Sequence, residues 1–225
     1  PEGFDHHYSE QVLRLDCSYQ ANSPSREITA VDFKDTHLPE DTFIFCNFNT
    51  RQKMNRETLH AWQAIIQQCP DSILWLLDPG PDMRREILNV LTGIEGRVFF
   101  AEQTEISRHL GRVGHANLFL DSFPYGAHTT ASDAVFRGVP VLARTGESFQ
   151  SRVAHSIIHF AGMPDMFAET WEDFIDKGIN FYNSYSATKA QELRKLLLDR
   201  TQERHPYNIQ WTTEQIEKAY KKILN

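Results

Sequence analysis

Cysteines are few in this sequence, and long apolar runs are missing from it. The three cysteines, Cys17, Cys46 and Cys69, show no Cys-x-x-Cys spacing, which argues against a disulfide framework and against a zinc knuckle. No segment approaches the roughly 20 apolar residues of a membrane span, and residues 1–10 lack the basic start and apolar run of a signal peptide. We therefore expect a cytoplasmic protein with no membrane partner.

Charge of either sign is never concentrated along the chain. Lysine and arginine total 23 against 30 aspartate and glutamate residues, a formal net charge of -7, and neither sign forms a block long enough to follow a phosphate backbone. Hydrophobic residues make up 40% of the 225 residues, which is too apolar for a disordered chain. The sequence predicts a globular protein that does not bind nucleic acid.

The motifs of several common ligand sites are also missing. There is neither a Gly-x-Gly-x-x-Gly fingerprint nor a Walker lysine loop, which removes the two commonest signals for dinucleotide and triphosphate binding. No Asp-x-Asp pair offers a carboxylate clamp for a divalent cation. The 10 histidines are scattered without a cysteine partner, so we expect no metal site.

Short apolar segments alternate with helical patterns through the middle of the chain. Runs this short and this apolar, each followed by a helix, are typical of a parallel sheet covered on both faces. The expected strands are residues 42–47, 72–77, 97–100, 117–121 and 140–143, and the expected helices are residues 56–69, 83–91, 105–113, 129–137 and 149–160. The fold class is therefore α/β, a doubly wound, Rossmann-like parallel sheet.

The two ends of the chain have a different texture. Residues 1–38 are polar and turn-rich and keep no helical period, which is typical of a lead-in segment. Beyond residue 163 the pattern is mostly helical, with helices expected at residues 171–180, 187–200 and 213–224, the last one capped by Thr212 or Thr213. We expect one Rossmann-like domain with C-terminal helices over residues 39–225.

The junction after the strand at residues 117–121 is the strongest candidate for a ligand site, because ligands of open parallel sheets bind beyond the carboxyl ends of the strands. A turn leads to His128, and Thr129 and Thr130 then open a helix with hydroxyls and unpaired backbone N–H groups. Such a helix start suits a phosphate or pyrophosphate, and Asp133, one turn further on, would reach a sugar hydroxyl. In the alternative interpretation, Thr129 only caps the helix and His128 only fills the turn.

Two further loops bring candidate side chains to the same edge of the sheet. Lys53 follows the first strand, where its charge would lie on a diphosphate; the alternative is a solvated lysine. His109 and Arg112 are three residues apart and share one helix face, so an imidazole would stack on a base beside a guanidinium. The alternative is a histidine and an arginine on a helix surface without a ligand.

Four motifs, in matching order and at matching intervals, closely resemble the C-terminal catalytic half of the protein O-GlcNAc transferase and SPINDLY-like family. The resemblance covers about Tyr8 to Leu224, and residues 8–10 and 18–22, within the lead-in of residues 1–38, are similar to that family's connector between its two catalytic lobes. The motifs are Asn47-Phe48-Asn49 with Lys53, Ser72 to Leu77, His128-Thr129-Thr130 with Asp133, and Gly146-Glu147-Ser148 with Ser151-Arg152-Val153-Ala154.

The resemblance implies a GT-B enzyme, and within it the UDP-sugar-binding lobe of an inverting, metal-independent protein glycosyltransferase. Lys53 and the helix start at Thr129 would stabilise the negative charge that grows on the departing UDP, in place of a metal ion. The implied roles are diphosphate binding by Lys53, stacking near uracil by His109 with Arg112 beside it, phosphate binding by Thr129 and Thr130, ribose binding by Asp133, and lining of the donor pocket by His128 and Asn49.

Departures from the family pattern leave the donor sugar open between GlcNAc, glucose and fucose. Thr50 stands where the O-GlcNAc transferases have glutamine, Ile106 where they have a basic residue, and Tyr125-Gly126-Ala127 where they have Cys-Asn-Gly. The run from Phe123 to Gly126 is also similar to bacterial protein N-glucosyltransferases of the same superfamily, which gives an alternative activity.

Family members also carry an N-terminal Rossmann-like lobe and usually TPR-like repeats that bind the acceptor protein. No second sheet of that kind and no repeat is found in these 225 residues. We therefore expect a fragment that binds UDP weakly and does not glycosylate a protein by itself. Two other interpretations stay open: the lobe of a GT-B enzyme acting on lipids or small glycans, and a non-catalytic UDP-binding or scaffold module.

Overall fold

The computed structural model, which describes residues 3–203 and 207–224, contains one parallel sheet of six strands in the order β3-β2-β1-β4-β5-β6. The chain starts at the centre of the sheet, and its direction of growth reverses between β1 and β4, which is the switch point of a doubly wound sheet. This order confirms the predicted fold class. The strands are β1 (Phe43–Asn47), β2 (Ser72–Leu77), β3 (Val98–Ala101), β4 (Leu118–Leu120), β5 (Val141–Arg144) and β6 (Phe167–Ala168).

Every helix expected from the sequence is present, with shifted ends. The start predicted at residue 149 is wrong, because residues 149–151 form a separate 3-10 turn and the α-helix begins at Val153. The helices are α1 (Arg56–Gln68), α2 (Pro81–Val90), α3 (Ile106–Val113), α4 (Thr129–Phe136), α5 (Val153–Phe160), α6 (Trp171–Asn183), α7 (Ala187–Glu203) and α8 (Ile209–Leu224), with short 3-10 helices η1 (Asp5–His7), η2 (Phe33–Thr36), η3 (Arg51–Lys53), η4 (Glu95–Arg97) and η5 (Phe149–Ser151). The two-residue strand β6 was not predicted, because it is too short for a pattern.

The predicted start of the last helix is wrong. Helix α8 begins at Ile209, four residues before the expected start at residue 213. The side chain of Asn208 accepts a hydrogen bond from the backbone N–H of Trp211 at 3.0 Å, as an N-cap residue does. Thr212 is therefore inside the helix, where its hydroxyl donates to the Asn208 carbonyl.

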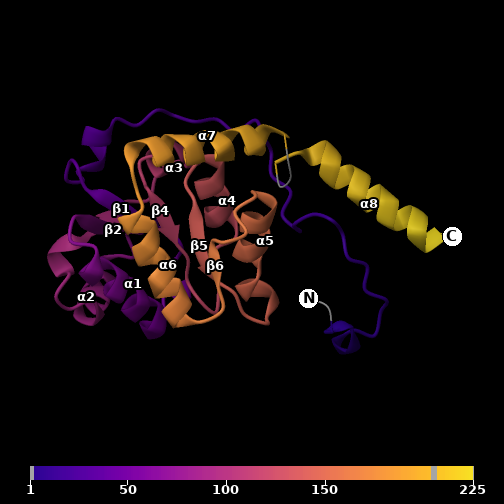
Figure 1. The fold of residues 1–225 in the computed structure, drawn as a ribbon, viewed down its shortest axis with the longest axis horizontal. Helices are drawn as coiled ribbons and strands as arrows, with labels where there is room; N and C mark the ends of the chain where they lie inside the picture. The colour runs from indigo at the N-terminus through magenta and orange to yellow at the C-terminus, as the bar shows by residue number, and fades with distance from the viewer. Residues whose placement is uncertain (1–2, 204–206, 225) are drawn as a thin grey trace.

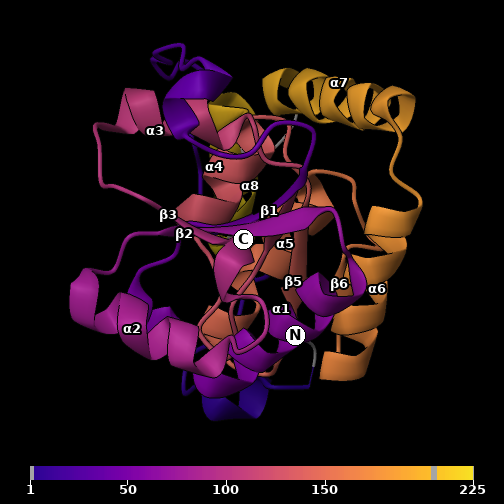
Figure 2. The same ribbon diagram turned by 90° about the vertical axis from the view of Figure 1, so that its left-hand side faces the viewer.

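Helices cover both faces of the sheet (Figures 1 and 2), and an apolar layer lies under them on each face. The side chains of β1 alternate between the two layers, since successive strand residues point to opposite faces. Phe43 and Phe45 pack with α1, α2 and α6, whereas Ile44 and Cys46 pack in the layer that α3, α4, α5 and α7 close. All five β1 residues are buried, so the strand lies at the centre of the core.

The lead-in segment forms no strand over residues 3–38; it begins on the side of α5 and α8, and its later part runs along the outside of helix α3 (Figure 1, indigo). The backbone N–H of Thr29 donates to the Ser107 carbonyl at 3.0 Å. Gly111 allows this approach, because a Cβ added there would lie 2.0 Å from the Thr29 carbonyl oxygen. A glycine in the middle of a helix is otherwise unfavourable, so this contact explains its presence.

Substitution Gly111→Ala is therefore expected to lower the free energy of unfolding by about 1–3 kcal/mol. The added methyl group meets backbone atoms, which cannot turn away as a flexible side chain does. Urea denaturation measures the effect. Gly96→Ala is the matched control, since a Cβ on Gly96 meets nothing within 4 Å. Equal stability of the two variants would show that residue 29 does not pack on α3.

A buried aromatic side chain, that of Tyr207, anchors the chain to the domain just before α8. Tyr207 is 1% exposed, packs on Phe136 and donates a hydrogen bond to the backbone carbonyl of Ser132 in α4. Beyond this anchor, α8 projects away from the sheet (Figure 1). Several large apolar side chains of α8 are exposed there: Ile209, Trp211, Ile216, Tyr220, Ile223 and Leu224.

Candidate functional site

The loops after β1 and β4 meet at the carboxyl edge of the sheet, at the switch point. Asn49 joins them: its side-chain amide donates to the Ser122 hydroxyl at 2.8 Å and to Oδ1 of Asp121 at 3.3 Å. Its amide oxygen accepts a hydrogen bond from the hydroxyl of Thr130 in α4. Asn49 is 2% exposed, so in this structure it connects the two loops and the start of α4 through buried hydrogen bonds.

Lys53 lies on the same edge and reaches the loop after β4. Its Nζ donates to the Gly126 carbonyl oxygen at 2.8 Å and lies 4.0 Å from the centre of the Tyr125 ring. Burial lowers the pKa of the Lys53 ammonium, and the nearby Asp121 carboxyl opposes that shift. The lysine predicted from sequence to carry the diphosphate therefore stands next to the turn that leads into α4.

Helix α4 begins at Thr129 with its first N–H groups uncapped by any side chain. Thr129 is exposed, and the hydroxyl of Thr130 is turned toward Asn49. His128 precedes the helix, and its Nδ1 is 2.9 Å from the hydroxyl of Tyr19. Free N–H groups and the positive end of the helix dipole form an anion site, and Lys53 adds a full charge beside it.

His109 and Arg112 lie together on α3, as the spacing predicted. Nε of Arg112 is 3.2 Å from Nδ1 of His109, and the His109 ring meets the Phe48 ring edge to face at 5.0 Å. Burial, helped by the Arg112 charge, lowers the pKa of His109 to about 4. The imidazole is therefore neutral near pH 7, as an aromatic platform for a base would be, and the guanidinium of Arg112 also donates to the Glu102 carbonyl.

Asp133 does not face solvent in this structure. It is 3% exposed, and its Oδ1 lies 2.7 Å from the guanidinium of Arg26 in the lead-in segment. Burial raises the pKa of Asp133, and Arg26 opposes this shift. The carboxylate predicted to bind a ribose is thus covered by an arginine in this structure. The ligand roles of all these residues stay predictions.

Asp121 is the main member of this cluster that the sequence did not single out. It follows β4 and is 1% exposed, and its Oδ1 accepts hydrogen bonds from the N–H groups of Ser122 and Ala127, both at 2.7 Å. Burial raises the pKa of Asp121 to about 7. An acid that ends an apolar strand is the signal that would have found it. These hydrogen bonds stabilise the turn between β4 and α4.

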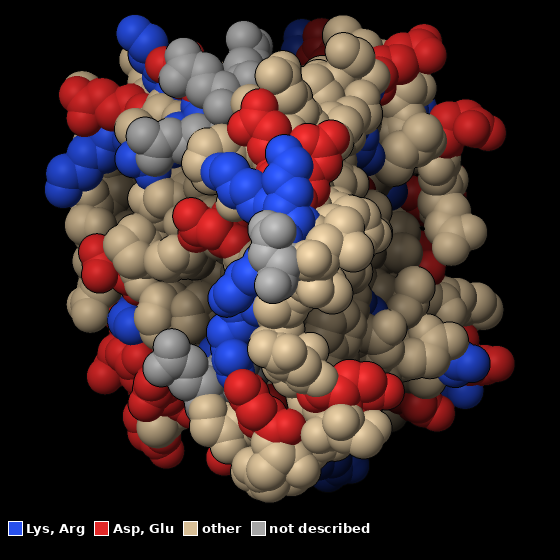
Figure 3. Space-filling model, turned by 90° about the vertical axis from the view of Figure 1, so that its right-hand side faces the viewer, with Lys and Arg blue, Asp and Glu red and all other residues tan. Residues whose placement is uncertain are grey.

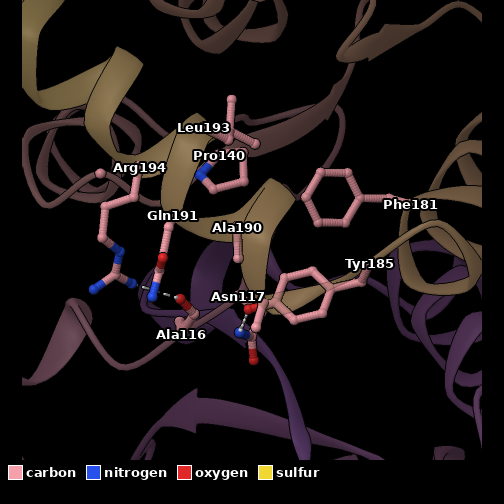
Figure 4. Close-up of a pocket in the computed structure, with 11 residues that line it drawn as sticks. Ala116, Asn117, Pro140, Phe181, Tyr185, Ala190, Gln191, Leu193 and Arg194 are labelled. Carbon is pink, nitrogen blue, oxygen red and sulfur yellow. Dashed lines mark hydrogen bonds between the residues drawn. The ribbon is translucent and has the colours of Figure 1, made fainter.

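One hollow of the surface, of about 420 Å³, adjoins this cluster, because Arg112 forms part of its wall. Two others have no residue of the cluster in their walls. A shallow one of about 300 Å³ lies at the amino ends of the strands, the opposite edge of the sheet (Figure 4). Asn117 and Pro140, which precede β4 and β5, form part of its wall, and Tyr185 and Arg194 reach it from the segment between α6 and α7 and from α7. A groove of about 640 Å³ separates residues 4–19 from η5 and α5, on the side of Tyr19.

Charge and metal-ligand patterns add little to the anion site. On the face in Figure 3, lysine and arginine side chains form a narrow stripe bordered by acidic groups.

Within residues 3–203 and 207–224, no cluster of three or more His, Cys, Asp or Glu side chains is placed to hold a metal ion. His155 and His159 are one turn apart in α5, but the His155 ring stacks on Phe167 at 3.8 Å. No helix among the described residues is long and apolar enough to cross a membrane.

Comparison with known proteins gives relatives for nearly the whole chain. Residues 14–216 match the model of glycosyl transferase family 41. The chain is 29% identical over 208 residues to a protein of Arabidopsis thaliana named as a probable UDP-N-acetylglucosamine-peptide N-acetylglucosaminyltransferase, covering 88% of this chain and 21% of that protein. It is 34% identical over 142 residues to a UDP-N-acetylglucosamine-peptide N-acetylglucosaminyltransferase of Caenorhabditis elegans, covering 61% of this chain and 12% of that protein.

Solved structures show the same fold. A mutant O-GlcNAc transferase of Thermobaculum terrenum superimposes with a TM-score of 0.78 over 99% of this chain and 42% of that chain, at 22% identity. The lipopolysaccharide glycosyltransferase WaaG gives a TM-score of 0.65 over 92% of this chain and 57% of that chain, at 14% identity. The six-stranded sheet is thus the Rossmann-like half of a GT-B architecture. Since the family model spans most of its length, this chain belongs to glycosyl transferase family 41.

Proposed function

We propose that this chain is the UDP-sugar-binding lobe of a protein glycosyltransferase and that its own contribution is stabilisation of the leaving UDP. The observation that carries the proposal is the meeting of Lys53 with the turn before α4, 2.8 Å from the Gly126 carbonyl. A lysine and an uncapped helix start at a switch point are suited to a nucleotide diphosphate. Membership of family 41 supports the same reaction class.

The chemistry follows from where charge develops. In the transfer, the bond between the sugar C1 and the UDP oxygen breaks while an acceptor group of a protein bonds to C1 from the opposite face. The electron pair stays on UDP, so negative charge grows on the diphosphate. Lys53 and the N–H groups that open α4 at Thr129 stabilise that charge without a metal ion. The proton of the acceptor group is taken up by a base that lies outside this cluster.

The remaining predicted residues would hold other parts of the donor. His109 supplies a neutral ring near the uracil with Arg112 beside it, and Asp133 binds the ribose. Thr130 binds phosphate oxygens together with Thr129, and His128 and Asn49 line the pocket. GlcNAc is the donor sugar we favour, because the relatives with 29% and 34% identity are named for UDP-N-acetylglucosamine. Thr50 and Tyr125 depart from the O-GlcNAc transferase pattern near the donor, so glucose is the alternative to test.

Recognition of the acceptor protein is assigned to other parts of the enzyme. The chain spans 21% and 12% of the two curated relatives. We propose that an N-terminal catalytic lobe and TPR-like repeats bind the acceptor, and that the enzyme works in the cytoplasm. The chain alone is then expected to bind UDP without transferring sugar.

Calorimetric titration of the chain with UDP, UDP-GlcNAc and UDP-glucose tests the proposal. We expect each to bind and the affinity to be the same with EDTA as with added magnesium, because the charges at the site come from the protein. Absence of binding by all three at millimolar concentration would contradict the nucleotide site. A radiolabelled-donor assay is the second part of the test. Sugar transfer to a protein by this chain alone would contradict the proposal that acceptor binding needs other parts of the enzyme.

A further inference from the structure

Residues 19–29, here called the strap, cross the candidate nucleotide site. Tyr19 contacts His128 through its hydroxyl, with the two atoms 2.9 Å apart, and the Gln20 amide reaches the hydroxyl of Thr129 at 3.5 Å. The strap thus touches Thr129, to which the proposed function assigns the diphosphate, and His128, which lines the same pocket. It reaches them from the lead-in, over 100 residues earlier in the chain.

The strongest contact of the strap is the ion pair between Arg26 and Asp133. The side chains of the pair are 17% and 4% exposed, with 2.7 Å between the guanidinium and the carboxylate. The Arg26 guanidinium also lies 5.2 Å from the centre of the Phe136 ring. With Arg26 in this position the Asp133 carboxylate is covered, so a ribose hydroxyl reaches it only after the arginine moves.

The two ends of the strap are held differently. At its rear, Thr29 bonds to Ser107 through backbone and hydroxyl, and its carbonyl lies against Gly111. Toward the front there is no regular secondary structure, and no residue from 19 to 29 is buried. Apart from the Arg26–Asp133 pair, the contacts of the front with His128 and Thr129 are exposed, and segments held by exposed polar contacts open with low free energy. Once that ion pair opens, the front can therefore release while the rear stays attached to α3.

We propose that the strap gates the nucleotide site, with Arg26 occupying the Asp133 carboxylate in the free protein and leaving it when a nucleotide's ribose binds. This inference rests on the proposed function. Only the released form accepts the ribose. The apparent affinity for UDP is therefore the affinity of that form multiplied by the fraction of molecules in which Asp133 is uncovered. A role for Arg26 in merely orienting Asp133 predicts the opposite effect on affinity.

Titration of Arg26→Ala with UDP separates the two roles. We expect this variant to bind UDP about 5- to 30-fold more tightly than the unmodified chain, and inorganic pyrophosphate, which has no ribose, to gain less. The matched control is Arg85→Ala, which removes an arginine paired with an aspartate on the exposed surface of α2. Unchanged or weaker UDP binding by Arg26→Ala, or an equal gain for pyrophosphate, would overturn the gate.

Hydrogen exchange of the nucleotide-free proteins gives a second readout. Arg26→Ala should speed exchange of the strap amides before residue 29, and Arg85→Ala should not. Unchanged exchange would show that Arg26 does not hold the strap and would also overturn the gate. If the unmodified chain binds UDP and Arg26→Ala does not improve it, the gate fails while the proposed function stands; if no variant binds UDP, the proposed function itself fails.

Discussion

Replacing Lys53 with methionine is expected to weaken UDP binding by about 10- to 150-fold, which corresponds to the roughly 1.5–3 kcal/mol of a hydrogen bond to a charged group. Methionine keeps an unbranched stem that packs against Tyr125 but removes the ammonium group 2.8 Å from the Gly126 carbonyl. Isothermal titration with UDP measures the loss. Urea denaturation of the same variant shows whether the domain stays folded.

Two controls make the Lys53 result specific. Lys189→Met removes an exposed lysine near the start of α7, and it should leave the affinity unchanged. Added salt should weaken UDP binding to the unmodified chain more than to Lys53→Met, because a charge contact is screened by ions. Equal affinities of Lys53→Met and the unmodified chain would remove Lys53 from the diphosphate site, and with it the main support for the proposed function.

Local sequence patterns were sufficient to predict most of the fold. The run of β1 is apolar from Phe43 to Cys46, and α1 carries Leu59, Trp62 and Ile65 on one face, so the local pattern was enough to predict both elements. Position at a strand end also identified Lys53 and Thr129, since all parallel strands finish at one edge. Strand β6 escaped because two residues carry no period.

Contacts between distant segments could not be predicted in the same way. Arg26 lies in a polar stretch that carries no period, and its pairing with Asp133 spans 107 positions, 133 minus 26. The sequence therefore showed Asp133 as a free carboxylate. The turn after β4 was predicted from its glycine and proline, but the hydrogen bonds that Asp121 accepts within it depend on burial by both helical layers, which only the tertiary structure supplies.

Substitution Asp121→Leu is expected to lower the free energy of unfolding by about 3–5 kcal/mol, the largest effect predicted for a single side chain of the site. Leucine removes the acceptor of the Ser122 and Ala127 N–H groups, and each N–H left without a partner in the interior costs about 1–3 kcal/mol. Asp121→Asn keeps a carbonyl oxygen for these donors and should lose much less. Urea denaturation compares the three proteins.

The pH dependence of the free energy of unfolding distinguishes the effect of the Asp121 charge from that of its hydrogen-bond geometry. Its pKa is about 7 in the folded protein against an ordinary 3.8, so between these values the folded chain keeps a proton that the unfolded chain releases. The stability that this group contributes is full below pH 3.8 and is lost as the pH rises to about 7. Asparagine does not titrate. The stability of Asp121→Asn relative to the unmodified chain should therefore improve by roughly 2.5 kcal/mol between about pH 5 and pH 8.

Asp82→Asn is the matched control for the substitution itself, since the Asp82 side chain is 90% exposed on α2 and its replacement leaves Asp121 in place. If the difference between Asp121→Asn and the unmodified chain did not change with pH, Asp121 would be ionised throughout, as an ordinary carboxylate is. Lys53 would then face a full negative charge in the free protein and would be partly neutralised before any diphosphate arrived. A protonated Asp121 leaves the Lys53 charge available to UDP, so the outcome bears on binding as well as on stability.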